Sequence, residues 1–419
     1  MLRGKSVKLL PTKEQEQLFI QFAGARRFAY NWALSREITT FENHEKFISV
    51  NDLCHEIVIL KKTDDDFKWL LDISCDVVKQ AIKDLGNAYS RFFSMQKKQG
   101  YQRFTKNTIK HSQITGKKLT SYDMNGHPKY KKRSNCQHSF HLDCMQVKFR
   151  NNYAFIQKIG FVKIANSNVF PQGKSGKDFK IANAKVKFDG KYWVLCGAVE
   201  TNVEKLTYDK TEPLGVDVGL KDTAILSNGI KYKNINKTQK VKKLEKRKKR
   251  LQKQCSRKYD MNNKNKSYKK THNIVKLEKQ IRLIDRKLSN IRKDYRHQIT
   301  TQIVKRNPIF ICVEDLNVEG MKRNKHLSKS VSDQGLGYIL SYFEYKCDQY
   351  DITLYKADRF YSSSKTCSCC GNIKNDLKLS DRIYKCSICG TVIDRDINAA
   401  INLREYGQQI FNKSINQAS

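Results

Sequence analysis

Four cysteines near the carboxyl end of the sequence have the spacing of a metal site. Cys367 and Cys370 form one Cys-x2-Cys pair, and Cys386 and Cys389 form a second pair after 15 intervening residues. Two such pairs supply four thiolates, the ligand set of a tetrahedral structural Zn²⁺ site. Because four protein ligands leave no open coordination position, we predict one Zn²⁺ ion with a role in folding, held in a zinc ribbon.

Neighbouring residues refine this prediction. Gly371 and Gly390 follow the two pairs and allow the tight turns that wrap a metal. Cys369 lies inside the first pair and could replace Cys370, but the two-residue spacing favours Cys370. The alternative is a group of reduced cysteines without metal, as we expect for the other, scattered cysteines of this chain.

A second group of chemically active residues is acidic and dispersed. Asp217 lies in the apolar stretch LGVDVG, and Glu314 ends the apolar stretch IFICVE. Asp394 and Asp396 open a helical pattern near the carboxyl end. An acid within a buried strand is costly unless it binds a cation or forms an ion pair. In a chain this basic, pairing with Lys or Arg is an equal alternative for any one of these acids.

The order of the acids along the chain is more specific than any one of them. An Asp in a first strand, a Glu at a later strand end and an Asp at a late helix match the RNase H-like fold, in which these acids converge. Converged carboxylates bind Mg²⁺ or Mn²⁺, which prefer oxygen ligands. Two such ions clamp the attacking and leaving oxygens of a phosphodiester. We therefore predict a two-metal site, with Asp394 or Asp396 as its third acid.

Hydrophobic periodicity predicts the elements that position these residues. Residues 1–10 indicate a strand, and 11–105 indicate a mainly helical lobe with apolar residues three and four apart. Strands are expected over 139–205, including a hairpin that turns at Asp189-Gly190. We expect these strands to form a small sheet or barrel that the first strand completes.

A long basic segment follows. The stretch from Lys240 to Lys270 holds 15 Lys and Arg residues against two acids. A heptad-like series of apolar residues then runs from Leu277 to Tyr295. The pattern predicts two long helices in a hairpin over 240–306. A solvated basic face is the alternative to a binding surface, and internal packing is favoured over dimerisation for the heptad residues.

The overall charge points to a polyanionic partner. The chain has 419 residues, with 81 Lys and Arg against 41 Asp and Glu, a formal net charge of +40. Such a charge is neutralised best by nucleic acid. The mean hydropathy is −0.67, and no apolar run approaches the roughly 18 residues of a membrane-spanning helix. The amino terminus has no apolar signal core, so we expect an intracellular protein without membrane contact.

Four stretches of sequence carry a family resemblance. They are PTKEQEQL with ARRFAYNWAL within 11–34, GVDVGLKDTAILSNG at 215–229, VEDLNVEGMKRNKHLSKSVSD at 313–333, and YSSSKTCSCCG with RIYKCSICGTVIDRDINAAINL within 361–403. The chain thereby resembles the TnpB-type (OrfB) transposon-associated proteins, which are RNA-guided DNA endonucleases. These proteins are related to compact type V CRISPR effectors and to Fanzor-like homologues. The match is weakest over 106–205.

The resemblance implies roles for the acids. The three acids of a RuvC-like site would be Asp217, Glu314 and Asp396, holding two catalytic Mg²⁺ (or Mn²⁺) ions. Asp394 stays an alternative ligand, although an acid at a helix start is also a natural cap. With a single nuclease motif in the chain, one site would have to cut both DNA strands in turn.

The resemblance also implies a multidomain α+β architecture. A small β-barrel (wedge) domain would comprise 1–10 with 130–212, interrupted by a helical recognition lobe and basic connector at 11–129. An RNase H-like (RuvC) α/β nuclease domain would comprise 213–361 with 393–406. A four-cysteine zinc ribbon would be inserted at 362–392, and 407–419 would form a flexible tail.

Guide RNA and target DNA are the implied partners, with the protein a monomer on one RNA. Basic side chains would hold the phosphates. The predicted contacts are Lys246, Arg247, Lys248, Lys249, Arg250, Arg26 and Arg27. Tyr30 and Trp32 could also touch nucleic acid, but core packing is the favoured role for both.

The expected function is RNA-guided, Mg²⁺-dependent cleavage of DNA beside a short target-adjacent motif, in a mobile element. Two alternatives remain. One is a transposase that performs strand transfer with the same carboxylates, and the other is an accessory nucleic-acid-binding protein that regulates transposition without guided cleavage. The expected location is the cytoplasm or nucleoid, or the nucleus for a eukaryotic or viral homologue.

Overall fold

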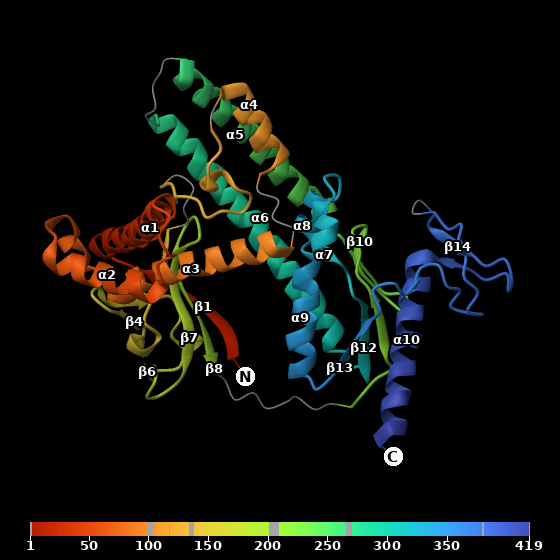
Figure 1. Cartoon of the computed structure of the whole chain (residues 1–419). Helices are drawn as coiled ribbons and strands as arrows, with labels where there is room; N and C mark the ends of the chain where they lie inside the picture. The colour runs from red at the N-terminus through yellow and green to blue at the C-terminus, as the bar shows by residue number, and fades with distance from the viewer. Residues whose placement is uncertain are drawn as a thin grey trace. The chain divides into compact units, whose positions relative to one another are not determined.

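The computed structural model describes residues 2–98, 104–116, 118–133, 138–200, 209–264, 270–378 and 381–418. Its internal contacts divide the chain into two compact units, Met1–Asn202 and Val203–Ser419. Both units mix helices and strands (Figure 1), so the predicted α+β class is confirmed. Across the described ranges, no helix combines the length and the apolar character needed to cross a membrane.

The first unit combines four α-helices with an eight-stranded sheet among its described residues. The helices are α1 (Lys13–Glu42), α2 (Val50–Thr63), α3 (Cys75–Lys98) and α4 (Lys106–Thr115), with short helical turns at η1 (Asp65–Asp72), η2 (Ser121–Asp123), η3 (Cys144–Gln146) and η4 (Ser167–Val169). The strands are β1 (Leu2–Leu10), β2 (Ser139–His141), β3 (Lys148–Arg150), β4 (Tyr153–Ile156), β5 (Gly160–Ile164), β6 (Gly173–Lys174), β7 (Ile181–Phe188) and β8 (Trp193–Glu200). Their order in the sheet is β2-β7-β8-β1-β5-β4-β3-β6.

The first strand lies in the middle of this sheet. It pairs antiparallel with β8 along its length and with β5 at its end, as the sequence predicted for residues 1–10. The β7–β8 hairpin turns at Asp189-Gly190, where Gly190 has a φ of 98°. Helix α1 then begins with a capping box, because Thr12 and Gln15 each accept a hydrogen bond from the other's backbone N–H.

Helices and sheet in this unit share one core. Phe19 and Phe22 of α1 pack on Phe140 of β2, with ring centroids 5.7 and 5.2 Å away, and Phe19 also meets Trp193 of β8 at 5.1 Å. The buried apolar residues of α1, α2, α3 and the sheet form a single cluster. The predicted helical lobe and strand domain therefore pack as one unit.

The second unit is built on a five-stranded mixed sheet. Its strands are β9 (Leu214–Asp217), β10 (Asp222–Leu226), β11 (Lys231–Lys233), β12 (Phe310–Glu314) and β13 (Thr353–Ala357), in the order β11-β10-β9-β12-β13. Its helices are η5 (Ile235–Lys237), α5 (Gln239–Lys264), α6 (His272–Val304), α7 (Val318–Arg323), α8 (Ser328–Gln334), α9 (Leu336–Gln349) and α10 (Arg395–Ala418). A two-stranded sheet pairs β14 (Ile383–Lys385) with β15 (Val392–Asp394).

Alternation along the strands separates the two faces of this sheet. Val216, Ile311 and Val313 join a core with residues of α6 and α9. Phe310 and Cys312, which point the other way, join a core with residues of α10. Figure 1 shows α10 along one side of the sheet and α6 and α9 along the other. Side chains that follow the Phe310 face must therefore meet α10.

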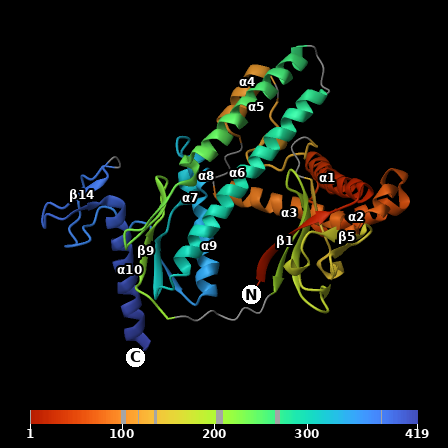
Figure 2. The ribbon, with the colours of Figure 1, turned by 180° about the vertical axis from the view of Figure 1, so that it is seen from behind.

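Helices α5 and α6 form the predicted basic hairpin. They lie side by side in both views (Figures 1 and 2), and Val241, Ile284 and Leu288 are buried between them. Arg292 of α6 adds ion pairs with Glu245 of α5 at 2.8 Å and with Asp333 of α8 at 3.0 Å. The heptad residues thus pack within the chain, as the sequence analysis favoured.

The last helix is longer than predicted. Helix α10 follows β15 without an intervening loop and continues to Ala418, so residues 407–418 are helical where a flexible tail was expected. The reason lies in its contacts with β12, because the Phe411 ring packs against the Phe310 ring with centroids 5.7 Å apart. A side chain added at Gly407 would come within 2.6 Å of the same Phe310 ring. This apolar contact extends the helix along the sheet.

Candidate functional site

Two of the predicted acids are brought together by strand register. In the parallel pair β9–β12, Val313 lies opposite Val216, and the next step along the ladder sets Glu314 beside Asp217. Asp217 is two residues from Gly215 and Glu314 is two from Cys312, so both carboxylates project from the α10 face of the sheet. Helix α10 begins one residue before Asp396, and the Asp396 charge is close enough to Asp217 to raise the pKa of that carboxyl. The three acids therefore converge from three separate parts of the sequence.

The convergence is visible in the electrostatics of Asp217. Burial, followed by the charges of the neighbouring Asp396 and Glu314 carboxylates, raises the pKa of this carboxyl to about 7, against the opposing effect of Arg395. Burial, followed by the charge of Asp315, also raises the pKa of Glu314. Like charges held together in this way are relieved either by a proton or by a cation. The cluster therefore offers a place where a metal ion could be held.

The carboxylates converge less tightly than the cysteines do. Within the described residues, the four cysteines are the His/Cys/Asp/Glu group whose ligand atoms all lie within 4.8 Å of one another. A site for two ions roughly 3.5–4 Å apart does not need that spacing, because its outer ligands bind different ions.

Asp394 has a different environment from Asp396. Its Oδ1 accepts hydrogen bonds from the backbone N–H groups of Asp396 and Ile397, at 2.9 and 3.2 Å, and its Oδ2 lies 2.6 Å from Lys231 Nζ. Burial opposes ionisation here, but the hydrogen bonds from Lys231 and from the two N–H groups lower the pKa of Asp394 overall. The capping role that the sequence suggested for Asp394 is confirmed, and both of its oxygens are engaged.

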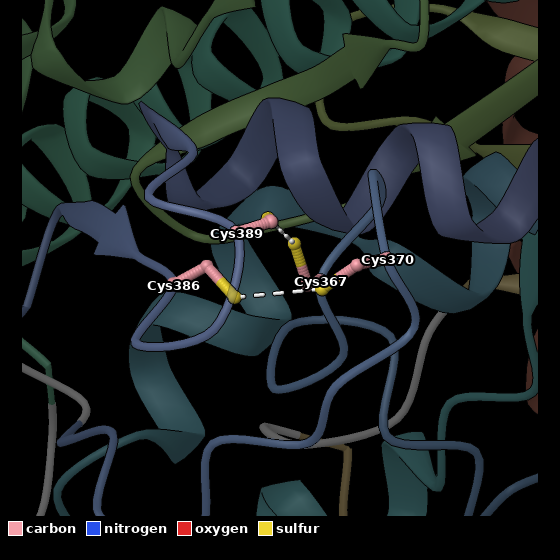
Figure 3. A group of neighbouring side chains, drawn as sticks. All are labelled: Cys367, Cys370, Cys386 and Cys389. Atoms are coloured by element: carbon pink, nitrogen blue, oxygen red, sulfur yellow. Dashed lines mark hydrogen bonds between the residues drawn. The ribbon is translucent and has the colours of Figure 1, made fainter.

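The four predicted cysteines form one cluster (Figure 3). Cys367 and Cys370 extend from one loop and Cys386 and Cys389 from another, and the four side chains point toward a common centre. The Sγ atoms of Cys367 and Cys389 are 3.6 Å apart, as are those of Cys370 and Cys386. Four sulfurs at about 2.3 Å from a tetrahedral Zn²⁺ would be spaced by nearly this distance. The thiolate set therefore fits zinc.

The remaining details of the cluster agree with the sequence analysis. Cys369 is exposed and is not part of the group of four. Gly371 and Gly390 have φ values of 75° and 72°, a left-handed conformation that a side chain would strain.

Two buried asparagines, which the sequence analysis missed, tie α10 to the first cysteine pair. Asn398 accepts a hydrogen bond from the N–H of Ser368 at 2.9 Å and donates to the carbonyl of Thr366 at 2.6 Å. Asn402 donates to the carbonyls of Ser363 and Thr366, both at 2.7 Å. Their sequence signal was the spacing of four in DINAAIN, which places both on one helix face.

The predicted basic contacts divide into two groups. On α5, Lys246, Arg247, Lys249 and Arg250 are exposed, whereas Lys248 pairs with Asp285 of α6. In the first unit, Arg26 is held internally by Asp84 at 2.7 Å and by the hydroxyl of Ser139 at 2.7 Å. Arg26 thus joins α1 to α3 and β2, and this geometry argues against its predicted contact with nucleic acid.

The neighbours of Arg26 follow the packing interpretation. Tyr30 is buried, and Trp32 is partly buried against the core. Arg27 is partly exposed.

Family models match three segments of the chain. Residues 198–325 match the OrfB IS605 model, described as "Probable transposase", and residues 1–46 match the associated "Helix-turn-helix domain". Residues 337–403, which contain the cysteine cluster and Asp396, match a domain described as "Cas12f1-like, TNB domain". The chain belongs to the TnpB-type (OrfB) family.

Relatives of this TnpB-type chain extend over nearly its full length. It is 25% identical to an Escherichia coli (strain K12) protein named "Putative RNA-guided DNA endonuclease InsQ", over 98% of this chain and 93% of that protein. It is also 25% identical to a Streptomyces pristinaespiralis protein named "Putative RNA-guided DNA endonuclease", over 97% and 89%. A solved "Cas12f1-sgRNA-target DNA complex" is 17% identical over 96% of this chain and 99% of that chain, with a TM-score of 0.31. The family assignment rests on the sequence matches.

Proposed function

We propose that this TnpB-type protein is an RNA-guided DNA endonuclease whose second unit is an RNase H-like (RuvC) nuclease domain. The observation that carries the proposal is the register of β9 and β12, whose next step would bring Glu314 beside Asp217, together with the effect of the Glu314 and Asp396 charges on the pKa of Asp217. The sheet order supports it, with β9, β10 and β11 antiparallel and β9, β12 and β13 parallel. Guided cleavage of DNA is supported by the names of the two relatives that match nearly the whole chain, both of which are named putative RNA-guided DNA endonucleases.

Asp217, Glu314 and Asp396 would hold two Mg²⁺ (or Mn²⁺) ions. Their oxygens suit hard cations, and the mutual repulsion that helps to raise the pKa of Asp217 is the charge such ions would neutralise. When bound, the ions would favour ionisation of the attacking water and offset charge on the scissile phosphate. Asp394 would orient the site from outside, because it caps α10 and pairs with Lys231.

The basic face of α5 would hold guide RNA or its duplex with target DNA. Lys246, Arg247, Lys249 and Arg250 are exposed along one helix, and Lys and Arg neutralise phosphates without reading bases. Sequence would then be read by base pairing with the guide, while the protein reads a short motif beside the target. The four cysteines would hold one structural Zn²⁺ ion against α10.

The first experiment is to purify the full chain from cells with its genomic locus and to sequence the bound RNA. We expect one defined transcript with a variable guide segment, and the complex should cut DNA that matches this segment when Mg²⁺ is present. Asp217→Asn should abolish cutting while RNA recovery stays unchanged. Asp222→Asn is the matched control, because Asp222 begins the adjacent strand β10. RNA of random sequence would argue strongly against guided cleavage.

Strand transfer is the second candidate function. The OrfB IS605 model that matches residues 198–325 is described as a transposase, and the same carboxylates could serve a DNA 3′-hydroxyl as nucleophile. The two reactions differ in their products. Incubation with target DNA and a donor end should give cut ends alone for an endonuclease and covalently joined strands for a transposase.

A further inference from the structure

An exposed aromatic side chain follows the strand that pairs with the strand of Glu314. Phe360 has 88% of its surface exposed, the highest fraction among the large apolar side chains in the described part of the chain. Strand β13 ends three residues earlier at Ala357, which is paired with Glu314 in the parallel ladder. Three residues span at most about 10 Å. Phe360 is therefore close to the strand ends that carry the predicted metal ligands.

The turn that carries Phe360 is held by hydrogen bonds and by packing against α10. The Asp358 carboxylate accepts the backbone N–H of Phe360 at 2.8 Å, and the Asp358 carbonyl accepts the N–H of Tyr361 at 3.0 Å. Tyr361 packs on Tyr406 of α10, with ring centroids 4.7 Å apart, and donates to the carbonyl of Asn402 at 3.3 Å. The turn is thus anchored on the helix that begins with Asp396.

The same turn is also tied to the strand of Glu314. Arg359 lies 2.7 Å from Asp315, the residue directly after Glu314. Phe360 is thus held between two residues, Arg359 and Tyr361, that contact β12's end and α10. In a mobile loop, an exposed phenyl ring could fold back onto apolar surface of the protein. This turn instead holds the Phe360 ring in solvent, so its apolar surface would be removed from water only when a ligand binds.

We propose that Phe360 stacks against a base of the single-stranded DNA that enters the carboxylate site and so positions the scissile phosphate. Aromatic side chains bind single strands in this way without regard to sequence, because every base offers a flat π face. A guided nuclease has to accept any target sequence at its cut site, and stacking meets that requirement. This inference rests on the proposed nuclease function.

The test combines a protein change with a DNA change. Single abasic residues are scanned through the nucleotides flanking the cut, and single-turnover cleavage is measured for the full RNA–protein complex. For wild-type protein, one abasic position should slow cleavage about 5- to 150-fold, the range that stacking of one base supports. Phe360→Ala should slow cleavage of intact DNA by a similar factor. For this variant, an abasic residue at the same DNA position should cause no further loss of rate.

Two companion variants define the aromatic requirement. Phe360→Trp should retain the rate on intact DNA, whereas Phe360→Leu, which is apolar but lacks a π face, should behave like Phe360→Ala. Ile114→Ala is the control for loss of an exposed apolar side chain, since Ile114 is also 74% exposed. The proposal is overturned if Phe360→Ala cleaves like wild type, or if it keeps the full abasic penalty.

A binding measurement separates failure of this inference from failure of the proposed function. Single-stranded DNA that carries 2-aminopurine should lose fluorescence on binding wild-type protein, because stacking quenches this base, and less on binding Phe360→Ala. If no DNA is cut but this difference appears, the nuclease proposal fails and the stacking role stands. If DNA is cut and neither rate nor fluorescence depends on Phe360, the stacking role fails alone.

Discussion

The side-chain amide of Asn398 bridges α10 to the first cysteine pair, with its Nδ2 only 2.6 Å from the carbonyl oxygen of Thr366. Asn398 is fully buried, so its removal would leave the Ser368 N–H without this partner and the Thr366 carbonyl with Asn402 alone. The same helix turn carries Asp396. The relationship joins the predicted zinc ribbon directly to the predicted third metal ligand.

Asn398→Ala should therefore destabilise the second unit by about 1–3 kcal/mol, because it leaves the partly buried N–H of Ser368 unpaired and removes one of the two hydrogen bonds to the Thr366 carbonyl. Thermal unfolding of the full chain measures this loss. Asn412→Ala, an exposed asparagine on the same helix, should change stability by less than about 0.5 kcal/mol. Equal effects of the two changes would contradict the bridging role.

Zinc content should depend on the four clustered cysteines and not on the fifth. Cys386→Ser should reduce bound zinc from one ion per chain and lower the unfolding temperature, since one thiolate of the tetrahedral set is lost. Elemental analysis of the purified protein measures the ion. Cys369→Ser is the matched control, because Cys369 is exposed and outside the group, and it should bind zinc as wild type does.

Asp394 and Asp396 should differ when each is changed to Asn. Asparagine is a good helix cap, so Asp394→Asn should keep α10 in place and retain most cleavage. Asp396→Asn removes a charged ligand and should abolish cleavage. Asp394→Ala, which removes the cap and the pair with Lys231, should cost about 1–2 kcal/mol of stability. Loss of all activity in Asp394→Asn at normal stability would make Asp394 the ligand instead.

Gly215 should be intolerant of any side chain. A methyl group there would overlap the Ala400 carbonyl and come within 2.5 Å of the Arg404 backbone nitrogen, so α10 would have to move away from β9. We expect Gly215→Ala to destabilise the protein by about 1–3 kcal/mol and to slow cleavage about 100-fold through displacement of Asp396. Gly4→Ala, where nothing lies within 4 Å, is the control in urea unfolding and cleavage assays.

Glu37 should make the stability of the first unit depend on pH. Glu37 is 3% exposed, and burial raises its pKa from 4.5 to about 7. As the pH rises, the carboxyl group therefore ionises in the unfolded chain before it ionises in the folded protein. Glu37 thus lowers the free energy of unfolding progressively between about pH 4.5 and pH 7, with little effect below this range and the full effect above it.

Glu37→Gln should remove this effect. The variant should be more stable than wild type by about 3 kcal/mol at about pH 8 and nearly equal to it at about pH 4.5. Urea unfolding at the two pH values measures the difference. Glu42→Gln changes an exposed residue of the same helix and should show no such dependence. A Glu37→Gln effect that is the same at both pH values would contradict the assigned cause.

Local patterns predicted much of the fold. The capping box at Thr12, the Asp189-Gly190 turn and the basic hairpin depend on residues close in sequence, so their signals are complete within short windows. The carboxyl end of α10 could not be predicted from such a short window. It depends on Phe411 meeting Phe310, a contact across about a hundred residues that no window of sequence contains.

The site divides in the same way. Cys367 and its three partners were predictable because ligand spacing is itself the signal. The grouping of Asp217 with Glu314 needed the family order, and the structure adds the register that explains it. The buried role of Arg26 escaped prediction, because its partner Asp84 lies on another helix and a surface arginine has the same local sequence.

The placement of α10 has a consequence for how the protein is made. A ribosome-bound chain that has emerged only through β13 already holds the strands of Asp217 and Glu314, yet the sheet face of Phe310 and Cys312 still lacks its covering helix. Because Asp396 arrives on that helix, the proposed cutting centre would be assembled last during translation. An unfinished chain would therefore already have the basic residues of α5 that we propose bind nucleic acid, but it would not yet be able to cut DNA.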